Sequence, residues 1–314
     1  MHSYSRVLVS GGAGFIGSHT VDRLLNEDLE VVVLDNLQSG LLENINAHFS
    51  KGKFRFVRGD IRDPGLVKAL VRDADAVVHL AALISVPESI RDPVLTSNVN
   101  VNGTLNLLKA CVDFSVKRFV YASSCAVYGN AESLPITEAC PARPESPYGV
   151  SKLIAENHVH DYHEDFSLET VCLRYFNVYG PRQIYGDYSG VITQFISRLT
   201  KDLPLVIFGD GEQTRDFVQV QDVAEANILA LKNGGVAGET FNIGTGVATT
   251  INQLANILLK VADKKHLKLD HSKPRKGDIK HSVADISKAR AQLGYNPEVS
   301  LKEGMTGLIK AALC

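Results

Sequence analysis

Short apolar runs alternate with longer amphipathic stretches through the first half of the chain. The runs are rich in β-branched residues, and they occupy Arg6–Ser10, Glu30–Leu34, Phe54–Arg58, Ala76–Leu80, Arg118–Ala122 and Thr170–Arg174. Continuous hydrophobicity, rather than strict alternation, is typical of strands that are buried on both faces of a sheet. Because helical stretches separate these strands, the pattern predicts a doubly wound parallel sheet, the Rossmann type of α/β fold.

The pattern changes after Gly180 and Pro181, where the segment 185–190 is aromatic and loop-like and the later elements become shorter. We therefore predict a Rossmann domain over residues 1–175 and a smaller C-terminal domain over residues 176–314. The stretches Val220–Lys232 and Thr240–Ile243 resemble the first half again, so the chain is expected to return to the sheet near residues 220–245.

Composition limits the classes of protein to consider. With 314 residues, of which 45% are hydrophobic, the chain can bury a large core in one or two domains. Its net charge of −2 does not indicate a nucleic-acid or membrane partner, and no apolar run approaches the roughly 18 residues that span a bilayer. The first predicted strand leaves no room for a signal peptide, and the five scattered cysteines favour a reducing compartment without a structural metal site. We expect a soluble, cytoplasmic protein.

A glycine-rich turn directly follows the first predicted strand and leads into a helix. Gly12, Gly14 and Gly17 have the GxGxxG spacing, and Gly11 precedes them. Glycine permits the tight turn and lets backbone N–H groups approach a pyrophosphate at the N-terminus of the helix. In this context the glycines predict a dinucleotide-binding site.

The second predicted strand leads to Asp35, 18 residues after Gly17. A carboxylate at this place can accept hydrogen bonds from both ribose hydroxyls and would repel a 2′-phosphate, so the predicted cofactor is NAD rather than NADP. Asp60 and Ile61, after the third strand, are expected to flank the adenine.

A tyrosine and a lysine four residues apart carry the candidate chemistry. Ser146 and Pro147 are typical of a helix start, so Tyr148 and Lys152 are predicted to lie on one helix face, one turn apart. A lysine ammonium beside a phenol favours the phenolate. We therefore predict that Tyr148 is a base whose pKa is lowered by Lys152, and that the Ser124 hydroxyl shares the proton of the substrate.

These motifs together resemble the extended short-chain dehydrogenase/reductase family, and more narrowly the NAD-dependent UDP-sugar 4-epimerases. The resemblance covers essentially the whole chain and rests on Gly11–Gly17, Asp35–Asn36, Gly59–Ile61, His79–Ala82, Ser123–Gly129, Ser146–Lys152, Leu173–Asn177, Gly209–Gly211, Thr214–Asp216 and Gly277–Asp278. It implies that NAD takes a hydride from C4 of the sugar while Tyr148 takes the 4-hydroxyl proton. The transient 4-keto sugar would then rotate in the site before the hydride is returned to its other face and the proton to its 4-oxygen. Lys152 would bind the nicotinamide ribose, and Ser124 would bind the 4-oxygen.

The resemblance also implies two sets of binding residues. The expected NAD contacts are Gly11, Gly14, Phe15, Ile16, Gly17, Asp35, Asn36, Ser39, Gly40, Asp60, Ile61, Leu80, Ala81, Ala82, Ser123, Tyr148, Lys152 and Tyr175. The expected UDP-sugar contacts, mostly in the C-terminal substrate-binding domain, are Ser85, Val86, Ser124, Tyr148, Asn177, Val191, Ile207, Arg215, Arg275, Asp278 and Ser282. Within the second set, Asn177, Arg215 and Arg275 would hold the diphosphate, since guanidinium groups suit phosphate, and Asp278 would hold the uridine ribose.

The residues after Ser124 bear on the reaction. Relatives that dehydrate or decarboxylate their sugar place acidic residues where this chain has Cys125 and Ala126, and neither of these can exchange a proton for elimination. We interpret Cys125 as a packing residue. The leading hypothesis is a UDP-hexose 4-epimerase. A UDP-glucuronate 4-epimerase or another nucleotide-sugar epimerase is the alternative, followed by a non-catalytic nucleotide-binding protein.

Two positions refine the resemblance. Ser282 stands where bacterial enzymes restricted to unacetylated sugars have a tyrosine, so the pocket is expected to admit a 2-N-acetyl group as well. Ile84 stands where many 4-epimerases have a lysine, which implies one cofactor contact fewer. By the same resemblance, the helix from Pro147 and a helix around 98–112 are expected to form a homodimer interface.

Overall fold

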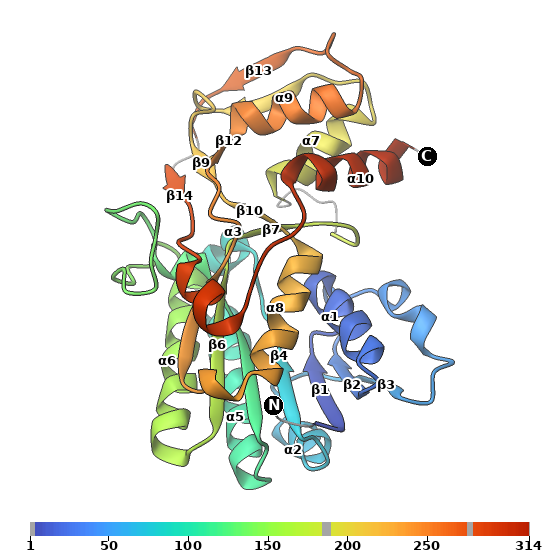
Figure 1. The fold of residues 1–314 in the computed structure, drawn as a ribbon, viewed down its shortest axis with the longest axis vertical. Helices are drawn as coiled ribbons and strands as arrows, with labels where there is room; N and C mark the ends of the chain where they lie inside the picture. Colours follow the sequence, from blue (N-terminus) through green and yellow to red (C-terminus); the bar gives the residue numbers. More distant parts are fainter. Residues whose placement is uncertain (1–3, 184–189, 275–278, 314) are drawn as a thin grey trace.

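The sheet predicted from the apolar runs is present in the computed structural model, which describes residues 4–183, 190–274 and 279–313. Seven strands lie in the order β11-β6-β5-β4-β1-β2-β3, and all neighbours are parallel (Figure 1). They are β1 (Arg6–Ser10), β2 (Glu30–Asp35), β3 (Phe54–Arg58), β4 (Ala76–His79), β5 (Arg118–Ser124), β6 (Glu169–Tyr175) and β11 (Glu239–Ile243). The predicted Rossmann fold is confirmed.

Helices cover both faces of the sheet because successive side chains of each strand point to opposite sides. Val7 and Val9 of β1 belong to the core under one helical layer, whereas Leu8 between them belongs to the core under the other. The first layer contains α1 (Phe15–Asn26) and α8 (Val220–Lys232). The second contains α2 (Pro64–Val71), α5 (Gly103–Asp113) and α6 (Pro147–Phe166).

Three strands extend further than their apolar runs suggest. β2 continues to Asp35, β5 continues through Ser123 and Ser124, and β6 continues to Tyr175, because these residues still pair with the neighbouring strands. The polar ends of the strands therefore belong to the sheet itself, and they lead into the site described below. The returns expected near residues 220–245 are found as α8 and β11, which is the edge strand beside β6.

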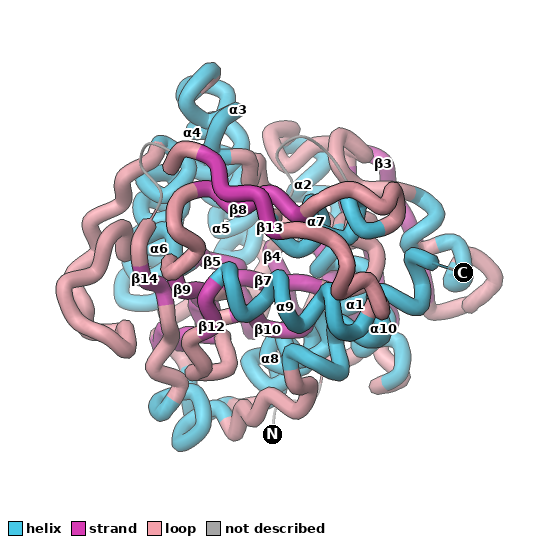
Figure 2. The backbone as a smooth tube through the Cα atoms, turned by 90° about the horizontal axis from the view of Figure 1, so that it is seen from above, coloured by secondary structure: helices cyan, strands magenta, loops and turns pink. Residues whose placement is uncertain are grey.

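A third core lies above the carboxyl ends of the strands, within residues 179–309 (Figure 1). Its helices are α7 (Val191–Leu199), α9 (Ile251–Val261) and α10 (Leu301–Leu313). Two small two-stranded sheets accompany these helices: β7 (Asn177–Tyr179) with β10 (Phe217–Gln219), and β8 (Leu205–Phe208) with β13 (Leu269–Ser272). A three-stranded sheet joins β9 (Thr214–Arg215) to β12 (Thr249–Thr250) and β14 (His281–Ser282). Figure 2 shows this part from above, with β8 and β13 side by side.

The remaining elements are short. They are α3 (Val86–Arg91), α4 (Pro93–Ser97), the π-helical turns Asn98–Asn102 and Ala289–Leu293, and the 3-10 turns Leu42–Asn44, Asn46–His48, Cys125–Val127 and Gly234–Val236. Among the helices of the described residues, none is long and apolar enough to cross a lipid bilayer.

Candidate active site

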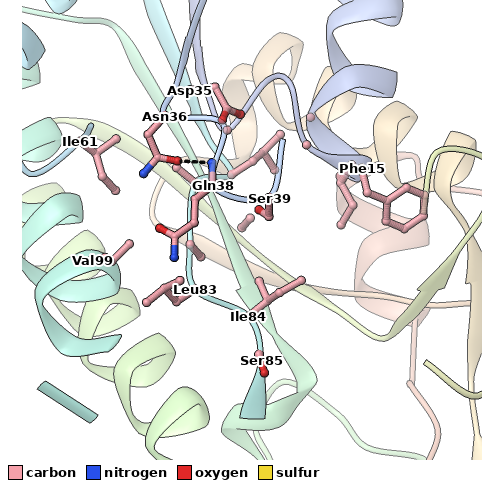
Figure 3. Close-up of a pocket in the computed structure, with 18 of the residues that line it drawn as sticks. Phe15, Asp35, Asn36, Gln38, Ser39, Ile61, Leu83, Ile84, Ser85 and Val99 are labelled. Atoms are coloured by element: carbon pink, nitrogen blue, oxygen red, sulfur yellow. Dashed lines mark hydrogen bonds between the residues drawn. The ribbon is translucent and has the colours of Figure 1, made fainter. Parts of the chain in front are cut away.

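A cavity of about 400 Å³ lies at the carboxyl ends of the central strands (Figure 3). It collects residues that were predicted from separate motifs: Gly11, Gly14, Phe15, Ile16, Gly17, Asp35, Asn36, Ser39, Asp60, Ile61, Leu80, Ala81, Ala82, Ser85, Ser123, Tyr148, Lys152 and Tyr175. The carboxyl ends of parallel strands are where open α/β sheets bind their ligands. One continuous cavity therefore joins the predicted nucleotide contacts to the predicted tyrosine base.

The glycine turn fits closely against the backbone around it. Gly11 has a φ of +74°, and a Cβ atom there would lie 2.6 Å from the backbone nitrogen of Ala81. A Cβ atom on Gly17 would overlap the carbonyl group of Gly11. Because side chains are excluded at both positions, the N-terminus of α1 stays open to a pyrophosphate. This cradle fits a dinucleotide.

Asp35 is held rigidly at the end of β2. Its carboxylate accepts hydrogen bonds from the backbone N–H groups of Ala13 at 3.0 Å and Leu37 at 2.8 Å. Burial raises the pKa of Asp35, and these hydrogen bonds oppose the shift. Gly40 is buried and does not line the cavity; a Cβ atom there would lie 2.8 Å from the Asp35 carboxylate. The structure thus gives Gly40 a supporting position rather than the predicted contact.

Asp60 lines the same cavity. It accepts hydrogen bonds from the Asn36 amide at 3.0 Å and from Arg62, whose guanidinium holds the pKa of Asp60 well below its usual range. Ile61 and Val99 contribute an apolar wall nearby (Figure 3). A charged group and an apolar wall at the end of β3 suit the edge and face of a base, as predicted.

The start of α6 presents Tyr148 toward Ser124. Ser146 caps the helix by accepting a hydrogen bond from the Gly149 N–H at 3.1 Å, so the helix begins at Pro147 as the sequence predicts. Ser89 accepts a hydrogen bond from the Tyr148 N–H at 3.1 Å. The Ser124 hydroxyl lies close enough to the Tyr148 phenol to lower its pKa, so the serine on β5 and the tyrosine on α6 are neighbours.

The predicted influence of Lys152 on Tyr148 is wrong for this structure. The Lys152 ammonium donates a hydrogen bond to the carbonyl oxygen of Ala122 at 2.7 Å and lies 4.9 Å from the centre of the Tyr121 ring. Burial raises the pKa of Tyr148 to about 12; the nearby Ser124 hydroxyl opposes this shift, whereas Lys152 does not contribute. Burial also lowers the pKa of Lys152 itself to about 7.

The C-terminal part of the chain comes close to Cys125, the residue that follows Ser124. The Ser282 side chain lies near the thiol of Cys125, and β14 pairs Ser282 with Arg215. Ser282 is buried and Cys125 is partly buried; burial raises the pKa of Cys125 to about 11, and the Ser282 side chain opposes this shift. This inert thiol agrees with a packing role and places Ser282 at the edge of the catalytic segment.

The other predicted substrate residues are more dispersed. Asn177 begins β7, where its amide donates to the Asp216 carbonyl at 3.3 Å, and Val191 begins α7. Val86 is exposed at the start of α3 and is not part of the cavity wall. Ile207 is completely buried in the third core and leaves no surface for a nucleotide, which corrects its prediction as a contact. Arg275 and Asp278 lie outside the described residues.

The structure adds a supporting residue that the sequence analysis missed. Asn100, in the π-helical turn, accepts a hydrogen bond from the Leu83 N–H at 2.8 Å and donates to the Ser151 hydroxyl at 2.9 Å. Ser151 in turn donates to the Tyr148 carbonyl at 2.7 Å. Asn100 therefore ties the cavity wall to the catalytic helix. Three asparagines alternate at 98–102, and only the π-turn shows which of them is buried.

The chain is similar over nearly its whole length to known enzymes that act on nucleotide sugars. The family model described as GDP-mannose 4,6 dehydratase matches residues 8–308. The UDP-glucose 4-epimerase of Mycolicibacterium smegmatis is 39% identical, with 97% of each chain covered. The solved UDP-glucose 4-epimerase of Thermus thermophilus, in complex with NAD, is 39% identical, with 98% of each chain covered and a TM-score of 0.87.

A further solved structure is similar over nearly its full length. The UDP-N-acetylglucosamine 4-epimerase of Methanobrevibacter ruminantium, in complex with UDP-N-acetylmuramic acid, is 38% identical, with 99% of this chain and 98% of that chain covered and a TM-score of 0.93. Relatives with other reactions are also similar. UDP-glucuronic acid decarboxylase 1 of Arabidopsis thaliana is 35% identical over 97% of this chain, and the UDP-glucuronic acid 4-epimerase of Bacillus cereus is 36% identical over 98% of it.

The glycine cradle gives a direct prediction. Gly17→Ala should abolish measurable NAD binding, because the added methyl group overlaps the Gly11 carbonyl and displaces the start of α1. Gly52→Ala is the matched control, since a Cβ atom there meets nothing within 4 Å. Isothermal titration with NAD⁺ measures both variants. Wild-type affinity in Gly17→Ala would contradict the assignment of the turn.

Proposed function

The chain belongs to the NAD-dependent epimerase/dehydratase family, and we propose that it is a UDP-hexose 4-epimerase. The observation that supports this reaction is the proximity of Ser124 to Tyr148, together with Cys125 and Ala126 instead of acids after Ser124. A serine and a tyrosine in contact can exchange the proton of one hydroxyl. Without a carboxylic acid next to them, these residues supply no proton donor for eliminating water from the sugar.

NAD is the cofactor, and the cavity supplies the groups that hold it. The glycine turn receives the pyrophosphate, Asp35 receives the adenosine ribose, and Lys152 stands at the opposite end, where the nicotinamide ribose belongs. When bound, NAD⁺ accepts a hydride from C4 of the sugar and returns it, so the reaction has no net redox change. The chain itself must orient the sugar and move one proton.

The proton moves between the sugar 4-hydroxyl and the Tyr148 phenol. Ser124 lies against the phenol and can bind the same 4-oxygen, which fixes the oxygen within reach of the base. Burial alone makes the phenolate unfavourable, so catalysis requires a positive charge near the phenol. Lys152 lies one helical turn away on α6 and is the group that we propose supplies this charge.

We propose that the substrates include 2-N-acetylated hexoses as well as glucose and galactose. Ser282 is small, lies against Cys125 and reaches the edge of the catalytic segment. A side chain of this size leaves room for an acetamido group where an aromatic ring would fill the space. The solved UDP-N-acetylglucosamine 4-epimerase of similar fold supports the same assignment.

A neutral sugar suits the cavity better than glucuronate does. Glu88 lines the cavity together with Ser85, one of the predicted sugar contacts. A sugar carboxylate close to Ser85 would therefore meet a like charge in a partly shielded site. This places UDP-glucuronate behind the neutral hexoses as a candidate substrate.

Tyr148→Phe tests the base assignment. The variant keeps the ring and the packing, so NAD affinity should stay at the wild-type value, whereas kcat for UDP-galactose should fall on the order of 10²-fold or more. A coupled assay of UDP-glucose formation gives kcat, and titration with NAD⁺ gives the affinity. Unchanged turnover would refute the role of Tyr148.

A matched pair of substitutions tests the sugar pocket. Ser282→Tyr should retain turnover of UDP-galactose but lower kcat/KM for UDP-N-acetylgalactosamine by roughly tenfold or more, because the phenol occupies the acetamido space. Ser287→Tyr is the control, since Ser287 is exposed on the same segment. Product NMR follows both substrates. A wild-type protein that is inactive on the acetylated sugar would overturn the proposed substrate range.

We also propose a homodimer formed through α6 and its neighbours. The large apolar side chains of Ile90, Val94, Val150 and Ile154 are exposed on α3, α4 and α6, which pack against one another. Such a patch is unusual on a monomer, and a two-fold axis would bury it against its own copy.

Light scattering tests this interface on a chain of 34.1 kDa. The wild-type protein should have twice that mass, and Val150→Asp with Ile154→Asp should shift it to the monomer because charges cannot be buried in the contact. Leu203→Asp, at an exposed leucine in the C-terminal part, should remain dimeric. A monomeric wild-type protein would exclude the proposed dimer.

A further inference from the structure

Three consecutive residues at the end of β5 contact three residues of α6 that are spaced by one helical turn. The Ser124 hydroxyl lies near the Tyr148 phenol, the Ala122 carbonyl accepts from Lys152 at 2.7 Å, and Ser123 donates to Glu156 at 2.5 Å. The first two contacts involve the proposed reacting groups. The third involves a glutamate that the proposed reaction does not use, although it continues the same helix face.

Glu156 is held from a second strand as well. Its side chain is 2% exposed, and the Arg174 guanidinium of β6 binds both of its carboxylate oxygens, with its Nε atom at 3.1 and 3.2 Å from them. Ser123 and Arg174 are directly paired across β5 and β6. A single carboxylate therefore fastens α6 to two strands at the level of the catalytic serine, and its charge-assisted hydrogen bonds are of the strong kind.

The connection continues toward the sugar pocket. Arg174 donates to the Tyr128 hydroxyl at 2.7 Å, and Tyr128 donates to Asn242 at 2.7 Å. Asn242 donates to the Ile136 carbonyl at 2.9 Å, and the Ile136 N–H donates to Val283, next to Ser282, at 2.8 Å. This buried chain of hydrogen bonds links the catalytic helix to the segment that approaches the sugar.

Glu156 also acts on Lys152 through space. Lys152 is buried, which disfavours its charged form, and the negative charge of Glu156 one turn away on α6 opposes this effect. The other titratable groups that face Lys152 are Tyr121 of β5, Cys172 of β6 and His79 of β4, besides Tyr148 on its own helix. Burial holds the pKa of His79 at about 3, so it is neutral, and burial raises the pKa values of Tyr121 and Cys172, so they are neutral as well.

We propose that Glu156 is a positioning residue of the reaction, which holds Tyr148 and Lys152 of α6 against the end of β5 and supplies the negative charge that the buried lysine ammonium requires. The proposal rests on the proposed function only in taking Tyr148 and Lys152 as the reacting groups. Glu156 itself does not line the cavity. It acts through α6.

A second ion pair between the same two strands, at their other end, serves as a control for a purely structural role. There, the buried Arg118 of β5 pairs with Glu169 of β6 at 2.8 Å. Glu156→Gln and Glu169→Gln each remove the charge that faces a buried arginine, so both should lower the melting temperature. Only Glu156→Gln should change the chemistry, with kcat falling by up to about 10²-fold while KM changes little.

The pH dependence of NAD⁺ affinity gives a readout that a structural role would not move. Lys152 binds the cofactor as an ammonium, so affinity should fall as the pH rises through the pKa of Lys152, which burial lowers to about 7. Glu156→Gln removes the charge that opposes this lowering, so the midpoint of the loss should move to lower pH. Glu169→Gln should keep the wild-type midpoint.

A double variant keeps the test decisive even if Glu156→Gln folds poorly. Glu156→Met with Arg174→Met replaces the pair by apolar side chains of similar volume and leaves no uncompensated buried charge. Its melting temperature should recover, whereas its pH midpoint should remain low and its kcat should remain reduced. Wild-type kcat and a wild-type midpoint in this variant would overturn the proposal.

The two proposals fail in different ways. If the wild-type protein turns over no UDP-sugar, the proposed function fails, while the pH midpoints for NAD⁺ still test the role of Glu156. If the wild-type protein is an active epimerase but all midpoints coincide, the proposal for Glu156 fails alone.

Discussion

The fixed register of α6 against the end of β5 is the constraint on which the site depends. A serine on a strand and a tyrosine on a helix can share a proton only if the two elements are locked together within hydrogen-bond distance. The β5 strand provides the Ser124 hydroxyl, the Ala122 carbonyl and the Ser123 hydroxyl in one short stretch, and α6 meets them at successive turns. β4 and β6 pair with β5 on its two sides, so the sheet keeps β5 in place beneath α6.

Burial at this register has an electrostatic cost that the neighbouring residues must offset. Burial excludes water from the site, and this raises the pKa of Tyr148 to about 12 and lowers the pKa of Lys152 to about 7. Both shifts oppose the charged forms that the chemistry requires. The Ser124 hydrogen bond and the Glu156 carboxylate act in the opposite direction. The catalytic pair therefore depends on groups outside the tyrosine–lysine motif.

Much of this arrangement follows from the sequence, and the reasons are local. Continuous β-branched runs predict the parallel strands, and Ser146 with Pro147 predicts the start of α6. The glycine turn requires a positive φ and close backbone contact, so its residues can be recognised from the sequence. The roles of Glu156 and Asn100 cannot be recognised from the sequence, because each depends on partners that are distant along the chain. The effect of Lys152 on the pKa of Tyr148 was predicted wrongly, since spacing along a helix does not show which carbonyl groups the lysine faces. Ile207 was misplaced for the same reason, as its burial depends on how the C-terminal helices pack.

The central claim is that one hydrogen leaves C4 of a UDP-hexose and returns to the same carbon on the opposite face. The most direct test is to incubate the protein and NAD⁺ with UDP-galactose deuterated at C4 and to examine the product by NMR and mass spectrometry. The predicted product is UDP-glucose that retains the deuterium at C4. A 4-keto-6-deoxy product, loss of the deuterium to solvent, or no conversion at all would contradict the claim.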